Sequence, residues 1–140
     1  MEFTHAFYDA LPPEAAAIRQ AVFVEEQGFQ EEFDAIDRHA LHLLLFADGR
    51  PGGTLRAFTE DGGTRWHIGR VAVIQSARQL HLGRRMMDLA EAELRRRGAA
   101  GIEVSAQCRV QPFYEKCGFT SVGEIYLDEF CPHIRMVKEL

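Results

Sequence analysis

The stretch of residues 70–97, RVAVIQSARQLHLGRRMMDLAEAELRRR, most constrains what this chain can fold into. It begins with small and β-branched residues typical of a strand, breaks at residues 75–77, and continues as an amphipathic helix. The apolar positions that recur every four residues in this helix are Leu82, Met86, Ala90 and Leu94. A strand, a short loop and the start of a helix therefore meet at one point of the chain.

The loop before this helix, residues 78–83, is a candidate anion site. The first turn of a helix has unpaired backbone N–H groups and a partial positive charge, and both favour phosphates. Arg84 and Arg85 add side-chain charge beside the loop. On the local pattern alone, an ordinary strand-to-helix connection with solvated arginines explains these residues equally well.

The length and composition indicate a single globular domain over residues 1–140. Of these residues, 46% are hydrophobic and 26% are charged, which is enough for one buried core but too little for two domains. The formal net charge of -5 argues against nucleic acid as a partner, because general affinity for nucleic acid depends on clustered lysine and arginine.

The ends and the cysteines of the chain exclude several further classes. The first residues, MEFTHAFYDALPPE, have neither a basic start nor an apolar run, and no later stretch is long enough to cross a bilayer. We therefore expect a cytoplasmic protein with no membrane partner. Cys108, Cys117 and Cys131 lack CxxC spacing, so we expect neither a metal site nor a disulfide framework.

The hydrophobic periodicity and the turn residues predict an α+β fold. We expect strands at residues 2–8, 39–47, 54–59, 65–74, 101–106, 119–126 and 133–138. We expect helices at residues 14–25, from residue 82 to a cap at Gly98, and at residues 110–117, with a functional loop or short irregular helix at residues 29–38. An antiparallel meander followed by a βαβ-type crossover gives a central mixed sheet with helices on both faces.

Several motifs resemble the GCN5-related N-acetyltransferase (GNAT) superfamily across nearly the whole chain. They are the strand RVAV, the loop RQLHLG that opens a helix, and the later segment AQCRVQPFYEKCGF. The segments RQAVFVEEQ, GRVAV and AQCRVQPFYEKCGF and the closing CPHIRM are similar to its ElaA-like branch.

The resemblance implies that acetyl-CoA lies between two splayed parallel strands, residues 65–74 and 101–106. Its pyrophosphate would bind backbone amides of residues 78–83. The implied cofactor-binding residues are Val71, Ala72, Val73, Arg78, Gln79, Leu80, His81, Leu82, Gly83 and Arg84. His81 departs from the family pattern, which usually has a glycine there because glycine accepts unusual φ and ψ values.

Acetyl transfer from a thioester to an amine needs a proton for the leaving thiolate. By resemblance, Tyr114 is the tyrosine that serves as general acid toward the sulfur of coenzyme A in many of these enzymes. The alternative is that Phe113, Tyr114 and Phe119 only pack a short helix onto the sheet.

The general base stays open between several residues. By resemblance, Glu26 lies at the acceptor site, with Gln27 beside it as a substrate contact, and Asp34 and Asp37 follow on the adjoining loop. Each carboxylate could equally be a solvated surface acid. His133 has a pKa range suited to proton transfer, although its ring could instead brace the last strand.

Three arginines, Arg19, Arg56 and Arg70, stand in otherwise apolar stretches. A buried arginine normally needs a carboxylate partner, and the nearest candidates are Glu26, Asp37 and Glu124. The sharper alternative is that they bind a substrate carboxylate, which makes Arg56 a candidate substrate-binding residue. Asp37 is another candidate, because its carboxylate could bind a cationic amine.

Together these features predict an acetyl-CoA-dependent N-acetyltransferase. The acceptor would be a primary amine of a small molecule or peptide, attacking directly in a ternary complex. The alternative is a non-catalytic acyl-CoA binding or sensing module with the same fold. A homodimer is a further hypothesis, because in many relatives a neighbouring subunit helps to complete the substrate site.

Overall fold

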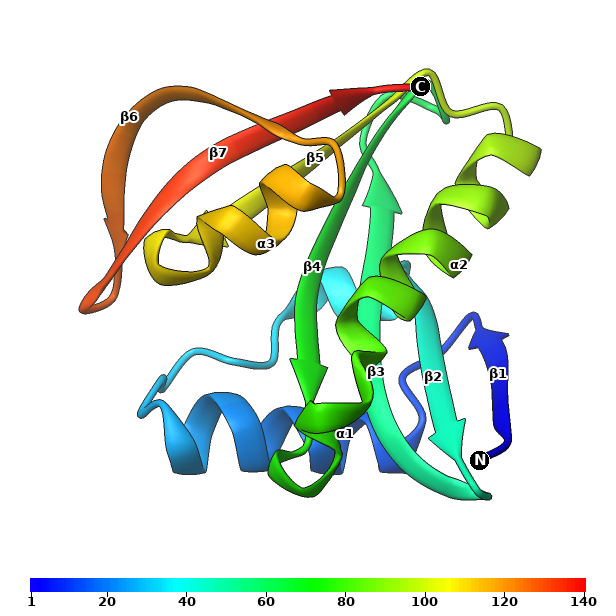
Figure 1. Ribbon diagram of the computed structural model, residues 1–140. Helices are drawn as coiled ribbons and strands as arrows, with labels where there is room; N and C mark the ends of the chain where they lie inside the picture. Colours follow the sequence, from blue (N-terminus) through cyan, green and yellow to red (C-terminus); the bar gives the residue numbers. More distant parts are fainter.

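Seven strands form one mixed sheet in the computed structural model, which describes residues 1–140 (Figure 1). In chain order they are β1 (Phe3–Tyr8), β2 (Leu41–Ala47), β3 (Arg50–Thr59), β4 (Arg65–Val73), β5 (Gly101–Gln107), β6 (Thr120–Asp128) and β7 (Cys131–Glu139). Their order in the sheet is β1-β2-β3-β4-β5-β7-β6, and only β4 and β5 are parallel neighbours. The predicted mixed sheet is confirmed.

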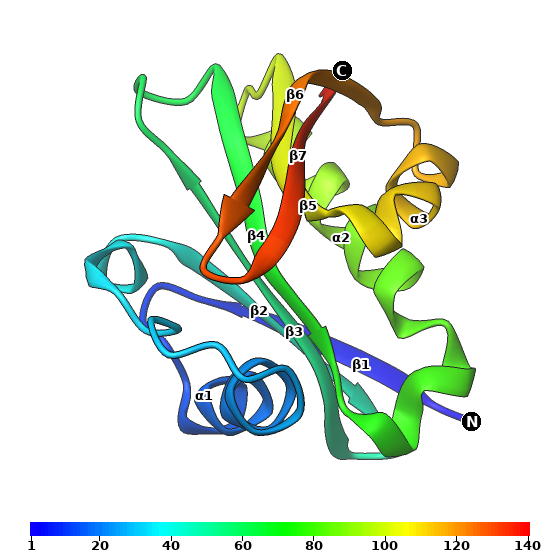
Figure 2. The same ribbon diagram turned by 90° about the vertical axis from the view of Figure 1, so that its left-hand side faces the viewer.

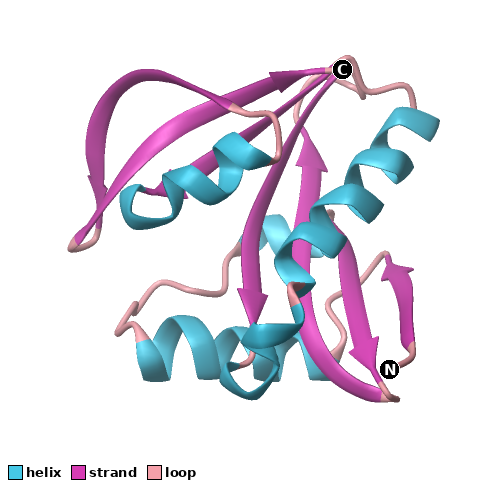
Figure 3. Cartoon of the chain, in the orientation of Figure 1, coloured by secondary structure: helices cyan, strands magenta, loops and turns pink.

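Helices cover both faces of the sheet, as predicted (Figure 2). They are α1 (Pro13–Arg19), α2 (Leu82–Arg96) and α3 (Gln111–Lys116), and α1 lies on the opposite face from the other two (Figure 3). Successive side chains of β2 point to opposite faces of the sheet. Leu43 and Leu45 therefore pack in the core under α2, whereas Leu44 packs in the core under α1. No helix is both long enough and apolar enough to span a bilayer.

Some elements differ in detail from the prediction. The helix predicted at residues 14–25 consists of α1 and a π-helical segment, Gln20–Glu26. Strand β3 begins at Arg50 because Asp48 and Gly49 alone make the turn, with φ values of 50° and 80° that suit a tight hairpin. Part of the predicted loop before α2 is a 3₁₀ helix, Gln75–Leu80.

Strands β4 and β5 pair over only part of their length. The parallel ladder joins Arg65–Ile68 to Gly101–Val104 and then ends. The next residues of β4 form a bulge against β3, where Arg70 adopts a left-handed conformation with φ of 52°. Because a bulge bends its strand, β4 turns away from β5 beyond this point (Figure 1). The splay that the family resemblance implies is therefore present.

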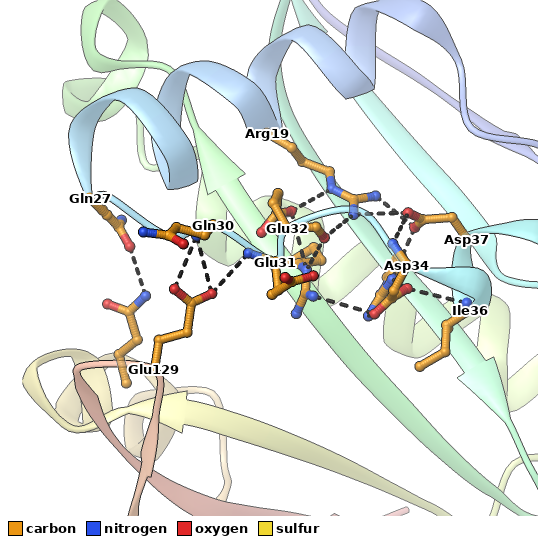
Figure 4. A network of polar contacts seen from close by, with 12 residues as sticks. Arg19, Gln27, Gln30, Glu31, Glu32, Asp34, Ile36, Asp37 and Glu129 are labelled. Atoms are coloured by element: carbon orange, nitrogen blue, oxygen red, sulfur yellow. Dashed lines mark hydrogen bonds and ion pairs between the residues drawn. The ribbon is translucent and has the colours of Figure 1, made fainter.

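A buried network of ion pairs ties the segment after the first helix to β3 and β4 (Figure 4). Its members are Arg19, Glu32, Asp34, Asp37, Arg56 and Arg70. Arg19 is fully engaged, since its Nε lies 2.8 Å from Glu32 and its Nη1 lies 2.8 Å from Asp37. Asp37 also accepts a hydrogen bond from Arg56 Nη1 at 3.0 Å, so one carboxylate pairs with two buried guanidinium groups.

The network sets the protonation of its carboxylates in opposite directions. Burial raises the pKa of Asp37, but hydrogen bonds and charges from Arg19 and Arg56 outweigh it and lower that pKa to about 2. Burial dominates at Glu32 and raises its pKa, even though Arg70 and Arg19 act against the rise. Asp37 is therefore the firmly ionised centre of the network.

The substitution Asp37→Asn should reduce stability strongly at neutral pH and less in acid. Removing the carboxylate leaves two buried arginines short of an anion, which costs about 3–5 kcal/mol in comparable sites. The folded pKa of about 2 lies below the unfolded value of 3.8, so the stabilisation is present above pH 4 and is lost as the pH falls toward 2. Urea unfolding at pH 7 and pH 3 should show that the difference in free energy of unfolding between the wild type and the variant is smaller at pH 3.

The pKa of Glu32 is shifted in the opposite direction, so its contribution to stability changes with pH in the opposite sense. Glu32 is present in both proteins, so this contribution largely cancels in the difference between their free energies of unfolding. The exposed Asp9 provides a matched control. A loss at pH 7 no larger than that of Asp9→Asn would contradict a stabilising network.

Candidate active site

A cavity of about 170 Å³ lies where the β4 and β5 ladder ends. Strand β4 contributes Gly69, Arg70 and Val71 to its wall, and β5 contributes Ser105 and Gln107. The end of the first helix, the loop after it, α3 and the β6–β7 turn supply the other walls. The cavity therefore opens between the splayed strands.

Tyr114 of α3 lines this cavity with only 8% of its surface exposed. Its ring packs edge-on against Phe113 and Phe119, with centroids 5.0 and 5.9 Å away. Only two fully buried side-chain nitrogen or oxygen atoms lack a hydrogen-bond partner, His42 Nδ1 and Arg56 Nε, and the Tyr114 hydroxyl is not among these fully buried atoms. The Tyr114 hydroxyl has no protein partner either, so it faces the open cavity. Burial raises the pKa of this phenol, which therefore stays protonated at neutral pH.

His133 of β7 also lines the cavity and is 5% exposed. Its Nδ1 lies 2.9 Å from the carbonyl oxygen of Cys131. Because a carbonyl only accepts, Nδ1 carries a hydrogen, and the lone pair of the neutral ring is then on Nε2. The ring is held against Phe29 and Tyr126, with centroids 6.4 and 6.0 Å away. The hydrogen bond from Nδ1 therefore leaves Nε2 as the ring nitrogen that can exchange a proton with a ligand.

Two contacts join the halves of the splayed sheet across the cavity (Figure 4). The carboxylate of Glu129, in the β6–β7 turn, accepts the backbone N–H of Gln30 at 3.0 and 3.1 Å and that of Glu31 at 2.9 Å. Gln107 Nε2 of β5 donates to Gln27 Oε1 at 2.8 Å. The loop after the first helix is therefore held over the cavity by the C-terminal half.

A second cavity, of about 460 Å³, lies at the start of α2. Arg78, Arg84 and Lys116 line it, and none of its lining residues is acidic. Gly83 packs closely, since a Cβ atom there would lie 3.2 Å from the ring of Phe113 and that ring would have to shift slightly. Positive side chains and the first N–H groups of a helix make this cavity suited to a phosphate group.

His81 adopts the backbone conformation that glycine adopts easily. Its φ of 56° and ψ of 38° are left-handed, and it joins the 3₁₀ helix Gln75–Leu80 to α2. A residue other than glycine incurs about 1–2 kcal/mol in this conformation. The departure from the family pattern therefore leaves the shape of the loop intact at an energetic cost.

The structure separates Glu26 from Gln27. Gln27 lines the cavity between the strands, whereas Glu26 pairs with Arg78 at 2.7 Å, beside the second cavity. Arg78 also donates from Nε to the carbonyl of Val73 at 3.2 Å. Glu26 is therefore placed to position Arg78.

Asp37 and Arg56 lie in the buried network and outside both cavities. The predicted pairing of buried arginines with Asp37 is confirmed, but pairing with Glu26 or Glu124 is wrong, and the other partners are Glu32 and Asp34. This placement favours the ion-pairing account of both residues over substrate binding.

Sequence reasoning missed Gln107 and Glu129, which hold the loop over the cavity. Glu129 and Gln30 are 99 residues apart, so no local pattern reports their contact. The one local signal is the acidic pair Asp128 and Glu129 in a short turn beside the CPHIRM segment.

The comparisons with known proteins agree with this geometry. The family model described as an acetyltransferase (GNAT) domain matches residues 9–140. The chain is 31% identical to the uncharacterised N-acetyltransferase YjcF of Bacillus subtilis over 129 residues, covering 90% of this chain and 91% of the relative.

Two solved structures superpose closely on the whole chain. An acyl-CoA N-acyltransferase from Pseudomonas aeruginosa is 31% identical with a TM-score of 0.82, covering 98% of both chains. Escherichia coli ElaA is 26% identical with a TM-score of 0.85, covering 99% of both chains.

The substitution Glu129→Ala should free the loop over the cavity. It removes the only side-chain acceptor of the Gln30 and Glu31 amides, so both should lose protection from hydrogen exchange while the core strands keep theirs. Native-state hydrogen exchange checks this, with the exposed Glu124→Ala on β6 as the matched control. Equal protection of the two amides in both variants would show that the contact does not hold the loop.

Proposed function

We infer that this chain, which belongs to the GNAT acetyltransferase family, transfers an acetyl group from acetyl-CoA to a primary amine of a small molecule or peptide. Enzymes of this family use acetyl-CoA and act on amines. The observation that supports turnover most directly is that Tyr114 and His133, both buried, present unpartnered polar atoms to one cavity. A pure binding module needs neither atom.

The two cavities fit the two ends of acetyl-CoA. The cavity at the start of α2 offers Arg78, Arg84 and Lys116 to the pyrophosphate. The backbone of β4 beyond Ile68 is not paired with β5, so the edge of residues 71–73 that faces β5 is open to the pantetheine amides, apart from the Val73 carbonyl that accepts from Arg78. When bound there, acetyl-CoA supplies an activated thioester carbonyl.

His133 acts as the general base in this proposal. Its Nε2 accepts a proton from the acceptor nitrogen, and the Nδ1 bond to the Cys131 carbonyl keeps the ring in the tautomer that can do so. Gln27, which lines the same cavity, contacts the acceptor. Glu26 positions Arg78 through their ion pair and does not take the proton.

Tyr114 assists departure of the thiol. Burial raises its pKa further above that of a thiol, so complete proton transfer from the phenol is uphill. Its main contribution is a hydrogen bond to the sulfur as negative charge develops there. The nitrogen–carbon bond forms as the carbon–sulfur bond breaks, and the proton lost from nitrogen through His133 balances the one gained by sulfur.

The substitution Tyr114→Phe should abolish most turnover while preserving cofactor binding. A positioned hydrogen-bond donor or acid contributes about a hundredfold or more, so kcat should fall by at least that order. The hydroxyl has no protein partner, so its removal should not lower the melting temperature. Thiol release from acetyl-CoA with a panel of amines measures the rate, and calorimetry measures acetyl-CoA affinity.

If this variant turned over at the wild-type rate, water or another residue would be the group that stabilises the leaving sulfur. The alternative function makes a different prediction for the wild-type protein. Acetyl-CoA that binds while no amine releases thiol would identify a binding or sensing module.

We also propose a homodimer formed through β6. This strand is the edge of the sheet, and an unpaired edge with apolar side chains favours pairing with a second chain. The exposed large apolar residues on β6 and the turn after it are Val122, Ile125, Tyr126, Leu127 and Phe130.

Aspartate at both Ile125 and Leu127 should convert the dimer to a monomer. The two side chains are 64% and 68% exposed and, two residues apart on a strand, lie on one face, so charges there would repel across the pair. Sedimentation at micromolar protein checks this against Ser121→Asp as the control. A wild-type protein that sediments only as a monomer would rule out the dimer.

A further inference from the structure

The rim of the cavity between β4 and β5 carries an excess of negative charge. Glu31, Asp128 and Glu129 line it with exposed side chains, and none forms an ion pair with an arginine or lysine. The Glu129 carboxylate accepts hydrogen bonds from the backbone N–H groups of Gln30 and Glu31. Glu32 also lines the cavity, but it is buried and neutralised by Arg19.

Apart from the ion pair of Arg70 with Glu32, the inner wall of the same cavity is uncharged. Phe23, Phe29 and Val110 are apolar, and the two buried polar groups, Tyr114 and His133, have free atoms that face the open space. A ligand that enters therefore passes from an acidic rim to a neutral, partly apolar interior. An amine can lose its proton more readily in such an interior, because burial disfavours the charged form of an amine.

We propose that the acceptor is a short diamine or polyamine, that is, a primary amine with a second cationic group. The reacting nitrogen lies at Tyr114 and His133, and the distal ammonium lies at the rim, against Asp128 and Glu31. This assignment rests on the proposed acetyltransferase function and names the substrate class of its acceptor site.

The size of the cavity restricts the acceptor further. Its volume of about 170 Å³ is below the roughly 300–1,000 Å³ of pockets that bury a drug-sized ligand. A linear chain of a few methylene groups matches this volume. A bulky multi-ring amine would extend well beyond it.

Arg109 provides the competing possibility. It lines the cavity, it is exposed, and its Nε donates only to Gln107 Oε1 at 3.0 Å. A free guanidinium could bind the carboxylate of an amino acid acceptor. The acids on the rim outnumber it, which favours a cation over a carboxylate at the distal position.

Three acceptors of matched length separate these possibilities. They are 1,5-diaminopentane, pentylamine and 5-aminopentanoate, which differ only in a distal positive, neutral or negative group. Acetyl transfer should be fastest for the diamine, with kcat/KM about tenfold or more above that of pentylamine, and slowest for the amino acid. Equal rates for the three, or a preference for 5-aminopentanoate, would overturn the proposal.

A double variant with Glu31→Gln and Asp128→Asn tests the assigned side chains. Neither carboxylate makes a hydrogen bond within the protein, and both are exposed, so the fold should be retained and a thermal melt verifies it. The ratio of diamine to pentylamine kcat/KM should fall toward one. The matched control, Glu60→Gln, lies outside the cavity and should leave that ratio unchanged. A ratio that survives in the double variant would overturn the assignment.

Binding measured without turnover separates this inference from the proposed function. Calorimetry with 1,5-diaminopentane and free coenzyme A requires no chemistry. Diamine binding that weakens about tenfold in the double variant supports the acidic rim even if no amine is acetylated, an outcome that would refute only the enzyme activity. Amine acetylation with no preference for the distal charge would refute only the diamine site.

Discussion

The buried ion network is the interaction on which the candidate site depends. The segment between the first helix and β2 has little regular structure, yet it forms one wall of the cavity between the strands. Arg19 and Arg56 hold it through Asp37, and Arg70 holds it through Glu32. A buried ion pair adds little net stability compared with a packed apolar pair, but leaving one member unpaired is costly. The network therefore restricts the segment to one position more than it strengthens the fold.

The same network is attached to the bulge that opens the sheet. Arg70 is the left-handed residue of β4 at the point where pairing with β5 stops, and its guanidinium reaches Glu32 and Asp34. One irregular residue thus supports two features that the proposed chemistry needs. It turns β4 away from β5, leaving backbone groups free, and it anchors the loop that faces them. The link explains why an arginine stands in an otherwise apolar strand.

The parts of the structure that the sequence predicts are those determined by local patterns. Periodicity identifies α2 and the strands, and glycine and charge identify the loop before α2. Side-chain directions were harder to predict. The side chains of successive helical residues point about 100° apart. Glu26 therefore points to Arg78 while Gln27 points into the cavity, although the two residues are adjacent in the sequence. Contacts such as Glu129 with Gln30 join distant segments, and a single sequence carries no record of them.

The two cavities differ in charge, and this difference bears on a reaction that requires both substrates at once. The chain has a net charge of -5, yet the cavity at the start of α2 is lined by arginine and lysine without acids. The rim of the other cavity is acidic, with Asp128 and Glu31 unpaired. Each field attracts one charge and repels the other, so the anionic pyrophosphate of acetyl-CoA and the proposed cationic acceptor do not compete for one site. The separation suits the proposed direct attack in a ternary complex, because a pyrophosphate or an acceptor bound in the wrong cavity would block the encounter.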